Sequence, residues 1–528
     1  MTVRMDDRRV ILGLCVGALV ALAAVILRLK AFSIDEMQYA HAAWLVAHGS
    51  VPYRDFFEVH FPLLYLALAP LSRLLPGAPW NQLLGFREAM AVALAVSVLA
   101  VQRWGSWLAV GILLTLAPFV QFAVEIRPDA VACAGFLLAL ALTVKAGGRR
   151  NASSWAGLAA GLAVFGTQKI VVAELCLVLP FWSGQLHRRA FLAGFLAGLL
   201  PVAAYLTVHH VWGDFAHWCF VWAAEHERGY PPLAASAYWV PLWWNHAVLF
   251  SLAGLGIAAE LRERRALLPL AALTSLLSIV LQRAAFPYSY LAFLGVCAGL
   301  AALGLMALAR RWPMWLVALG TLGWLGSQAV ETARLLDFTN RAQERVLAKV
   351  EQLTAPDDRA YDNSGGFIAR PHAFWFFYTD AYLRTVMIPE LEGEVPAALL
   401  AQHTVLKLTD LREAGLPKKL RDFLTEHYQP FDGDLFLWGQ HYAPASSAQS
   451  FLAVKRAQYF IEPPAALEQG HLQVDGREVR AAPFLLEAGP HTVHYQGAAP
   501  AFDILWLPRN GEAWHPDRDA RPSYSQLL

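Results

Sequence analysis

Long apolar segments, separated by short basic ones, fill about the first 330 residues of the chain. A helix needs about 20 apolar residues to cross the hydrocarbon layer of a membrane. By this measure we predict eleven spans, at residues 10–29, 83–102, 106–123, 129–145, 154–168, 170–183, 190–208, 238–258, 266–282, 287–308 and 313–332. The first span ends in Arg28-Leu29-Lys30 rather than in a cleavage site of small residues, which indicates a retained anchor.

Two further apolar stretches follow the first span and are predicted to lie on the membrane surface. Residues 34–47 repeat apolar side chains at helical spacing. Residues 60–75 are apolar but short, and they contain Pro70 and Arg73. Counting 60–75 as a span would move every later basic cluster to the other side of the membrane, so we predict two interfacial helices.

The basic clusters give an independent test of this topology, because Lys and Arg concentrate in cytoplasmic loops. With the N-terminus inside, the predicted cytoplasmic segments hold nearly all of them: Arg4, Arg8, Arg9, Arg103, Arg149, Arg150, Arg188, Arg189, Arg262, Arg264, Arg265, Arg310 and Arg311. Residues 30–82, 124–128, 209–237 and 283–286 then form outer loops. An eleventh span leaves the C-terminal part outside.

The C-terminal part is mixed in polarity and differs from everything before it. Residues 336–446 alternate helical and strand patterns and predict a small α/β unit, followed by a linker-like patch at 443–447. Residues 447–528 predict short strands, with a hairpin at 472–479 around Asp475-Gly476 and a second pair at 485–495 around Gly489-Pro490. The predicted fold is mainly α: a polytopic helical domain (1–335), this α/β unit and a small β-sandwich-like module.

Composition supports a membrane protein and excludes other classes. Hydrophobic residues make up 57% and charged residues 16%, against roughly half and a quarter in soluble domains. The formal net charge of +1 gives no sign of nucleic-acid binding. The 5 cysteines lie in or beside apolar segments, without zinc-site spacing or a disulfide framework, and are interpreted as small buried residues.

Ionisable residues recur at the predicted outer ends of the spans. Such residues rarely face lipid and usually line a water-filled cavity. The set comprises Asp35, Glu36, Arg54, Asp55, Glu58, His60, Glu125, Arg127, Asp129, Lys169 and Arg283, with Tyr288 close to the last of these in sequence.

The mixture of signs in this set suggests transfer from a phosphate leaving group. The carboxylates of Asp35, Glu36, Glu125 and Asp129 could hold a divalent cation or supply a general base. Three cations could bind phosphate: Arg127, Lys169 and Arg283. A structural role stays open for single residues, since Arg54 and Asp55 can fix a turn and Arg127 can pair with an acid beside it.

The ordered motifs resemble the GT-C superfamily of integral-membrane glycosyltransferases, especially members related to protein O-mannosyltransferases and aminoarabinose transferases. The resemblance covers roughly residues 1–335. It rests on Asp35-Glu36-x-x-Tyr39-Ala40, Gly49-x-x-Pro52-Tyr53-Arg54-Asp55, Glu58-x-His60-x-Pro62-Leu63-x-Tyr65, Arg87, Arg127-Pro128-Asp129, Lys169 and Phe286-Pro287-Tyr288.

The resemblance implies a polyprenyl-phosphate-linked sugar donor and a site at the periplasmic face of a bacterial inner membrane. It places the acceptor base or anchor at Asp35, beside Glu36, and a second acidic site at Asp129. A divalent metal stays open, with Glu36, Glu125 and Asp129 as its ligands. The remaining substrate- and phosphate-binding residues would be Glu58, His60, Arg127, Lys169, Arg283 and Tyr288.

The leading hypothesis is therefore an inverting glycosyltransferase that moves a sugar to a lipid, glycan or protein acceptor. The alternative is a polytopic transporter or lipid flippase. A transporter often shows repeated halves and a midplane site, whereas this sequence shows no internal repeat and its charges gather at one face. A third hypothesis, a membrane anchor for the C-terminal part, does not need eleven spans.

Overall fold

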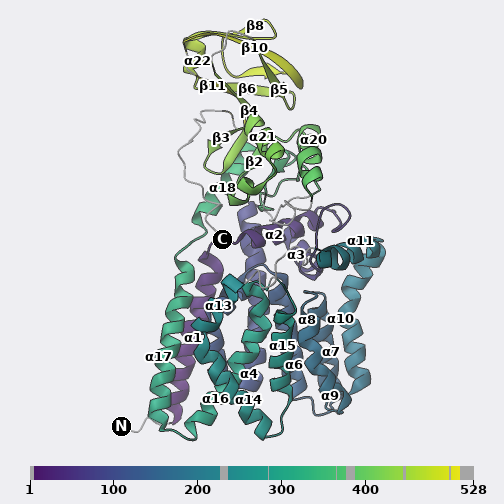
Figure 1. Ribbon diagram of the computed structural model, residues 1–528, viewed down its shortest axis with the longest axis vertical. Coiled ribbons are helices and arrows are strands. Elements are labelled where there is room, and N and C mark those ends of the chain that lie inside the picture. Colours follow the sequence, from purple (N-terminus) through teal and green to yellow (C-terminus); the bar gives the residue numbers. More distant parts are fainter. Residues whose placement is uncertain are drawn as a thin grey trace.

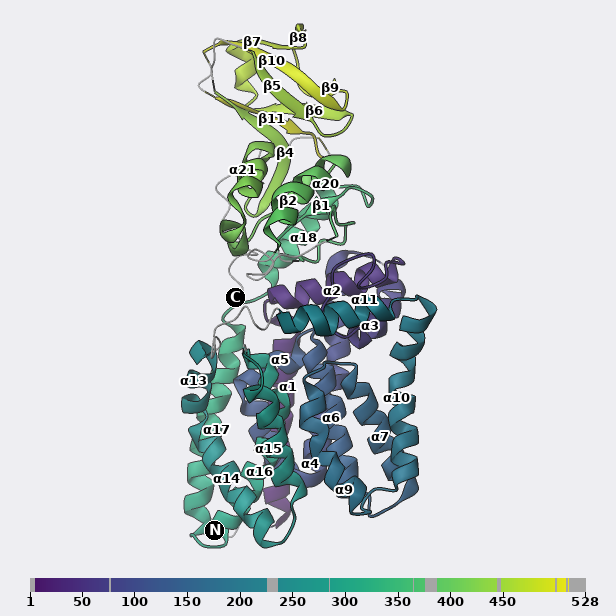
Figure 2. The same cartoon turned by 45° about the vertical axis from the view of Figure 1, so that its right-hand side comes forward.

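The protein is elongated, with a bundle of roughly parallel helices at one end and a tail of sheets at the other (Figure 1). A computed structural model describes residues 5–75, 77–225, 236–283, 285–363, 365–375, 387–443, 448–498, 501–509 and 511. Helices α2 (Ile34–Ala47), α3 (Leu63–Leu74) and α11 (Trp212–Ala216) lie crosswise between bundle and tail (Figure 2). We call this side of the bundle the capped end and the opposite side the far end.

Helices occupy every predicted span. They are α1 (Met5–Leu29), α4 (Pro79–Thr115), α5 (Ala117–Val124), α6 (Pro128–Val144), α7 (Arg150–Val164), α8 (Ile170–Glu174) continuing through η1 (Leu175–Leu177) into α9 (Val178–Trp182), α10 (Arg188–Val208), α13 (Ser236–Asn245), α14 (Ala247–Arg262), α15 (Leu267–Val280), η3 (Pro287–Tyr290) with α16 (Leu291–Ala309), and α17 (Met314–Ala333). The prediction of a mainly helical, polytopic domain is confirmed.

Few of these helices are long and apolar without interruption. Among the described residues, three pass a test of length and apolar composition for crossing a membrane, or four when α5 and α6, bent by 110°, count as one span. The other apolar helices are shorter or broken, as in the run from Ile170 to Trp182. The bundle therefore combines full-length helices with interrupted ones.

Helix α4 contains the turn that the sequence predicted between two spans. Ser106 has φ 74° and ψ 173°, outside the helical region, and divides α4 into two helices. Arg87 near the start of α4 and Ile126 just after α5 both bind the Glu36 carboxylate. The chain therefore runs from the capped end to the far end at Ser106 and returns.

The crosswise layer contains α2 (Ile34–Ala47) and α3 (Leu63–Leu74), close to the two predicted interfacial helices. At 1.5 Å per residue, the 12 residues of α3 span about 18 Å, too short for a membrane about 30 Å thick. Figure 2 shows α2 and α3 lying across the end of the bundle. The assumption that kept Asp35 and Asp129 on one side is therefore supported.

The third crosswise element lies within the predicted outer loop 209–237, for which the sequence indicated no helix. Residues 212–222 form α11 (Trp212–Ala216) and the π-helical η2 (His217–Trp222). Aromatic packing holds this helix down: the Phe215 ring lies 5.0 Å from Phe61 and 5.5 Å from Tyr53. Residues 226–235 lie outside the described part of the chain.

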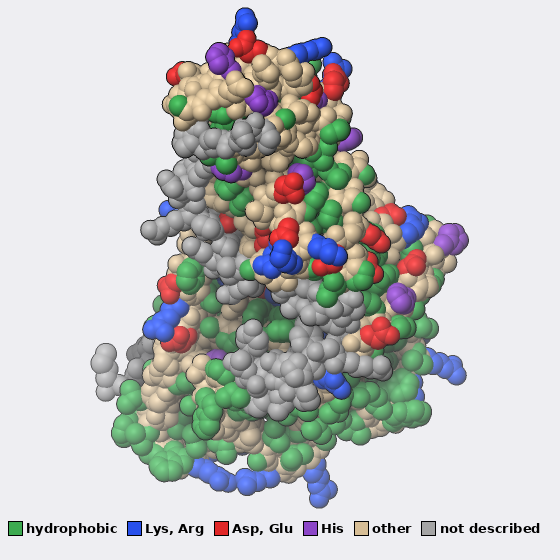
Figure 3. All heavy atoms as spheres, turned by 45° about the horizontal axis from the view of Figure 1, so that its top comes forward, with side chains coloured by type: hydrophobic (Ala, Val, Ile, Leu, Met, Phe, Trp, Pro, Cys, Tyr) green, Lys and Arg blue, Asp and Glu red, His purple; other side chains and the backbone are tan. Residues whose placement is uncertain are grey.

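Basic residues gather at the far end. Arg150 from the start of α7 and His187, Arg188 and Arg189 from the start of α10 line one pocket of about 450 Å³. Figure 3 shows Lys and Arg side chains along this edge, below a surface dominated by hydrophobic side chains. The two predicted cytoplasmic loops therefore meet at the same end of the bundle.

The tail is built on one sheet that runs through both of its predicted parts. It begins with α18 (Arg341–Leu353), and η5 (Glu390–Glu394), α20 (Val395–Ala401), η6 (Leu411–Gly415) and α21 (Lys418–His427) surround the first strands. The strand order is β1 (Ala360–Tyr361), β2 (Leu406–Leu408), β4 (Leu435–Tyr442), β11 (Phe502–Trp506), β6 (Ala457–Glu462) and β9 (Phe484–Leu486), with β3 (Tyr428–Asp432) pairing β4. Residues 444–447 of the predicted linker lie outside the described part, and the domain boundaries stay a prediction.

A second sheet has the order β5 (Gln449–Ala453), β10 (Gly489–Gly497), β7 (Gly470–Val474) and β8 (Arg477–Val479), with the short helix α22 (Ala465–Glu468) before β7. The predicted hairpin is confirmed, since β7 and β8 pair across Asp475 and Gly476, both at positive φ. The predicted pairing within 485–495 was wrong. β9 pairs with β6 in the first sheet, whereas β10 pairs with β5 and β7.

Hydrogen bonds to the backbone of residues 32 and 57 tie the tail to the capped end. The side-chain amide of Gln343 in α18 both accepts from the Phe32 amide and donates to the Phe32 carbonyl, each at 2.8 Å. The Phe57 amide donates to the Trp375 carbonyl at 3.0 Å. The tail therefore lies directly over the start of α2, which carries Asp35 and Glu36.

Candidate active site

Helix α2 holds the two acidic residues by its own N-terminal cap. Ser33 is the N-cap: its hydroxyl accepts from the Glu36 amide at 3.4 Å, and the Glu36 carboxylate accepts from the Ser33 amide at 2.9 Å. This reciprocal capping box satisfies amides that a helix start leaves unpaired. Asp35 and Glu36 thus lie in the first turn, where the helix dipole favours negative charge.

Glu36 is fully buried in an ion pair with Arg87 of α4. Arg87 Nε donates to Glu36 Oε1 at 2.8 Å, and Nη2 donates to Oε2 at 2.5 Å. Arg87 also donates to the carbonyls of Lys30 and Ala31, at 2.5 and 3.2 Å, which binds α4 to the end of α1. Both groups are satisfied, so the pair has the character of a structural clamp.

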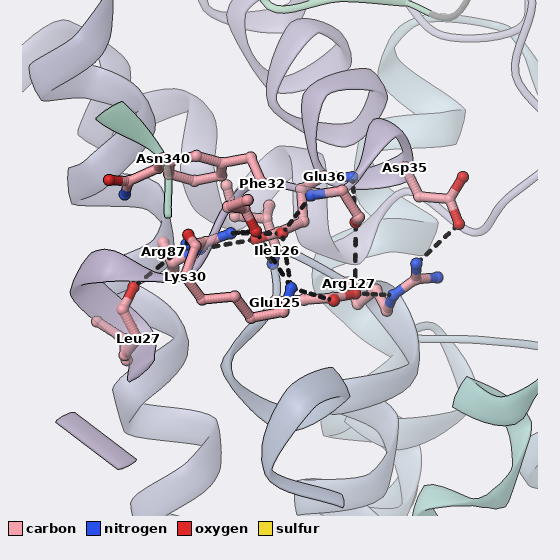
Figure 4. A network of polar contacts seen from close by, with 12 residues as sticks. Leu27, Lys30, Phe32, Asp35, Glu36, Arg87, Glu125, Ile126, Arg127 and Asn340 are labelled. Atoms are coloured by element: carbon pink, nitrogen blue, oxygen red, sulfur yellow. Dashed lines mark hydrogen bonds and ion pairs between the residues drawn. The ribbon is translucent and has the colours of Figure 1, made fainter. Parts of the chain in front are cut away.

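A second buried carboxylate, Glu125, joins Lys30 to Arg127 (Figure 4). Lys30 Nζ donates to Glu125 Oε1 at 2.8 Å, and Arg127 Nε donates to Glu125 Oε2 at 2.7 Å. Ile126, between these residues, donates its amide to Glu36 Oε1 at 3.1 Å. The break between α5 and α6 is therefore fixed against the start of α2.

Asp35 is the accessible carboxylate of this network. Its side chain is 28% exposed, and its Oδ2 accepts from Arg127 Nη2 at 2.7 Å. Burial alone would raise the pKa of Asp35, but Arg127, together with Arg412 of η6, holds that pKa below its usual value. Asp35 is therefore ionised at neutral pH and carries its charge at the surface of the buried network.

The ring of Tyr288 joins Arg127 to a second cation. The Arg127 guanidinium lies 4.3 Å from the ring centroid, and Lys169 Nζ lies 4.9 Å from it. Lys169 Nζ also lies 4.0 Å from Asp129 Oδ1 and donates to Ser289 Oγ at 3.3 Å. A continuous path of contacts thus runs from Asp35 to Asp129.

Glu58 and His60 form a separate pair beside this path. Glu58 Oε1 accepts from His60 Nδ1 at 2.7 Å and from the amides of Val59 and His60 at 2.8 and 2.9 Å. On its other side, His60 Nε2 lies 3.2 Å from the hydroxyl of Tyr39 in α2. Tyr39 follows Asp35 by one helical turn, which links the pair to the acidic helix.

The structure thus brings together most of the predicted site residues from distant parts of the chain. Arg283 lies exposed in the turn after α15, and its predicted role in phosphate binding stays a prediction. Lys30 and Arg412 were missed. Lys30 directly follows the first span and could have been included, whereas no local signal connects Arg412, in the tail, with Asp35.

The predicted metal site finds no geometric support. The carboxylates of Glu36 and Glu125 already accept hydrogen bonds from Arg87, Lys30 and Arg127. Cationic side chains therefore occupy the oxygens that a metal ion would need as ligands. Within the described ranges, no group of three or more His, Cys, Asp or Glu residues is arranged to hold a metal ion. These contacts speak against a divalent cation held by Glu36 and Glu125, and metal binding at Glu36, Glu125 and Asp129 stays a prediction.

Comparison with known proteins identifies the fold. No family model matches the sequence, and no curated protein matches it. The structure is similar to a crystal structure of ArnT from Cupriavidus metallidurans bound to undecaprenyl phosphate, with 14% identity, a TM-score of 0.53 and coverage of 76% of this chain and 93% of that chain. For the apo crystal structure of that protein the identity is 16%, the TM-score is 0.55, and the match covers 76% of this chain and 92% of that chain. The chain therefore has the predicted GT-C-like fold.

Proposed function

We propose that this chain, which has the fold of ArnT, is a membrane glycosyltransferase that takes its sugar from a polyprenyl-phosphate donor. The ArnT structure bound to undecaprenyl phosphate supports a lipid phosphate as the leaving group. The basic far end and the tail at the capped end support a cytoplasmic N-terminus and a site at the periplasmic face of the inner membrane. The acceptor would be a lipid, a glycan or a protein.

The observation that carries the proposal is an incompletely satisfied Arg127 beside an accessible carboxylate. Arg127 is 3% exposed, and among the described residues its Nη1 has no hydrogen-bond partner. A buried guanidinium nitrogen without a partner is costly, and a phosphate oxygen would supply one. Lys169, on the other side of Tyr288, would bind the same phosphate.

In the proposed reaction, a hydroxyl or amine of the acceptor attacks the anomeric carbon of the sugar. The bond from that carbon to the acceptor forms as its bond to the phosphate oxygen breaks, and the electron pair leaves with the phosphate. Arg127 and Lys169 stabilise this developing charge. Asp35 accepts a hydrogen bond from the acceptor and orients it, and a single displacement inverts the anomeric centre.

Mass spectrometry of envelope lipids and glycans tests the function directly. We expect a deletion strain to lack one sugar modification that its parent carries, and the wild-type gene to restore it. An unchanged envelope would contradict the proposal. Movement of a lipid across vesicles containing the purified chain, without a change in its mass, would instead identify a transporter.

The phosphate site predicts weaker lipid binding when Lys169 is neutralised. A hydrogen bond to a charged group contributes about 1.5–3 kcal/mol, so Lys169→Gln should weaken binding of undecaprenyl phosphate by roughly 10- to 100-fold. Titration of the purified chain with undecaprenyl phosphate measures this change. Arg54→Gln is the matched control, because Arg54 is an exposed cation of the same end that pairs with Asp55. Equal loss in both variants would indicate non-specific charge attraction.

A further inference from the structure

The chain Glu58–His60–Tyr39 ends beside Asp35 and has no role in the steps described so far. Asp35 and Tyr39 are four residues apart on α2, so their side chains lie on the same face of the helix. Tyr39 is almost fully buried, whereas the His60 side chain is 31% exposed. The line of contacts therefore leads from the acidic helix towards solvent.

Hydrogen bonding fixes the direction in which this chain can move a proton. A carboxylate oxygen only accepts, so His60 Nδ1 must donate to Glu58 Oε1 across the 2.7 Å contact. The other nitrogen of the neutral ring, Nε2, then has its lone pair towards the Tyr39 hydroxyl at 3.2 Å. Tyr39 therefore donates to His60, and its oxygen lone pairs are left to accept from a substrate.

Glu58 is built to stabilise a positive charge on His60. Its side chain is fully buried, three donors converge on Oε1, and Oε2 has no hydrogen-bond partner among the described residues. A buried carboxylate with an unsatisfied oxygen gains from a cation nearby. Protonation of His60 would provide one.

Asp35 is poorly suited to be the final proton acceptor. The guanidinium of Arg127 holds the Asp35 pKa low against the effect of burial, which makes this carboxylate a weak base. Burial, and after it the charge of Asp35, raises the pKa of the Tyr39 hydroxyl. Tyr39 is therefore a protonated hydroxyl that can pass a proton on as it receives another.

We propose that Glu58, His60 and Tyr39 form a proton relay that accepts the proton of the attacking acceptor, an inference that rests on the proposed glycosyl transfer. As the acceptor bonds to the anomeric carbon, its proton moves to the Tyr39 oxygen. The Tyr39 proton moves to His60 Nε2, which gives an imidazolium paired with Glu58. The imidazolium then loses its Nε2 proton to water that reaches the partly exposed ring, so no other reactant is needed.

The test uses the purified full chain, with membranes of a deletion strain supplying both donor and acceptor. Tyr39→Phe removes only the hydroxyl, and we expect the initial rate at saturating membranes to fall by about 10²-fold, within the usual range for proton transfer by a positioned group. Undecaprenyl phosphate should bind as tightly as before, which a structural defect would not allow. Tyr65→Phe is the matched control, since the Tyr65 and Tyr39 ring centroids lie 6.3 Å apart. The transfer rate of this variant should be unchanged.

A second variant gives a readout that a packing role would not produce. His60→Ala should lose as much rate as Tyr39→Phe, and added imidazole should restore part of it, because the site of His60 is open to solvent. The double variant should be no slower than either single one, since both interrupt one relay. A normal rate in Tyr39→Phe, or no recovery of His60→Ala with imidazole, would overturn the relay alone. Absence of transfer by the wild-type chain would overturn the proposed function and the relay with it.

Discussion

Asp35→Asn should reduce sugar transfer by about 10³-fold or more while leaving the amount of folded protein unchanged. The substitution keeps the shape and one accepting oxygen, but it removes the charge that we propose orients the acceptor opposite the proposed phosphate-binding cations. Preorganised electrostatic groups of this kind contribute about 10²–10³ each, and loss of the correctly held acceptor adds to this. Rates with membranes of a deletion strain and the thermal midpoint of the purified variant measure the two quantities.

The stability should hardly change because Asp35 is partly exposed and Arg127 keeps its bond to Glu125. Asp55→Asn is the matched control: Asp55 is also a partly exposed carboxylate, in the same loop, paired with Arg54 at 2.9 Å. We expect it to transfer sugar at the wild-type rate. Full activity in Asp35→Asn would remove Asp35 from the site, whereas equal loss in both variants would indicate a general effect of charge on the loop.

The membrane domain was largely predictable because its elements follow from local rules. Apolar length predicted the helices, the basic clusters predicted which turns meet at the far end, and the weakness of 60–75 as a span predicted a helix in the crosswise layer. Helix α11 was not predicted because its apolar side chains are mainly aromatic and lie among polar residues. Its stability comes from Phe61 and Tyr53, which are distant in sequence.

Strand pairing in the tail shows the same limit. The hairpin of β7 and β8 carries its own Asp-Gly turn, so local chemistry specifies it. β9 and β10 are also neighbours in sequence, yet they belong to different sheets. β9 pairs with β6 and β10 pairs with β5. A sequence pattern does not show which of two distant strands each will join.

Most of the candidate site residues lie close together in the structure, but the sequence could not divide them into roles. Asp35 and Glu36 are adjacent acids in one motif, and only the structure shows that one is partly exposed and the other buried against Arg87. Whether Asp35 or Glu36 faces the bundle depends on how α2 packs against α4. For the same reason the sequence did not reveal Arg412, whose charge in the tail helps to lower the pKa of Asp35.

Arg87→Met should destabilise the protein strongly. It leaves the Glu36 charge buried without its guanidinium, and it frees the carbonyls at the end of α1. Removing one partner of a buried ion pair costs about 3–5 kcal/mol. We expect a strongly lowered thermal midpoint and little folded protein. Arg28→Met is the matched control, because Arg28 joins the same two helices through Glu88 but is exposed, and such pairs contribute about 1 kcal/mol or less.

The double variant Glu36→Met with Arg87→Met then separates structure from chemistry at Glu36. Replacing both charges removes the unpaired carboxylate, so the double variant should be more stable than Arg87→Met alone. If Glu36 only clamps α2 to α4, this variant should retain at least a tenth of the transfer rate, because Asp35 and Arg127 keep their contact. A stable double variant without any transfer would instead show that Glu36 takes part in the reaction, as its position next to Asp35 in the sequence had suggested.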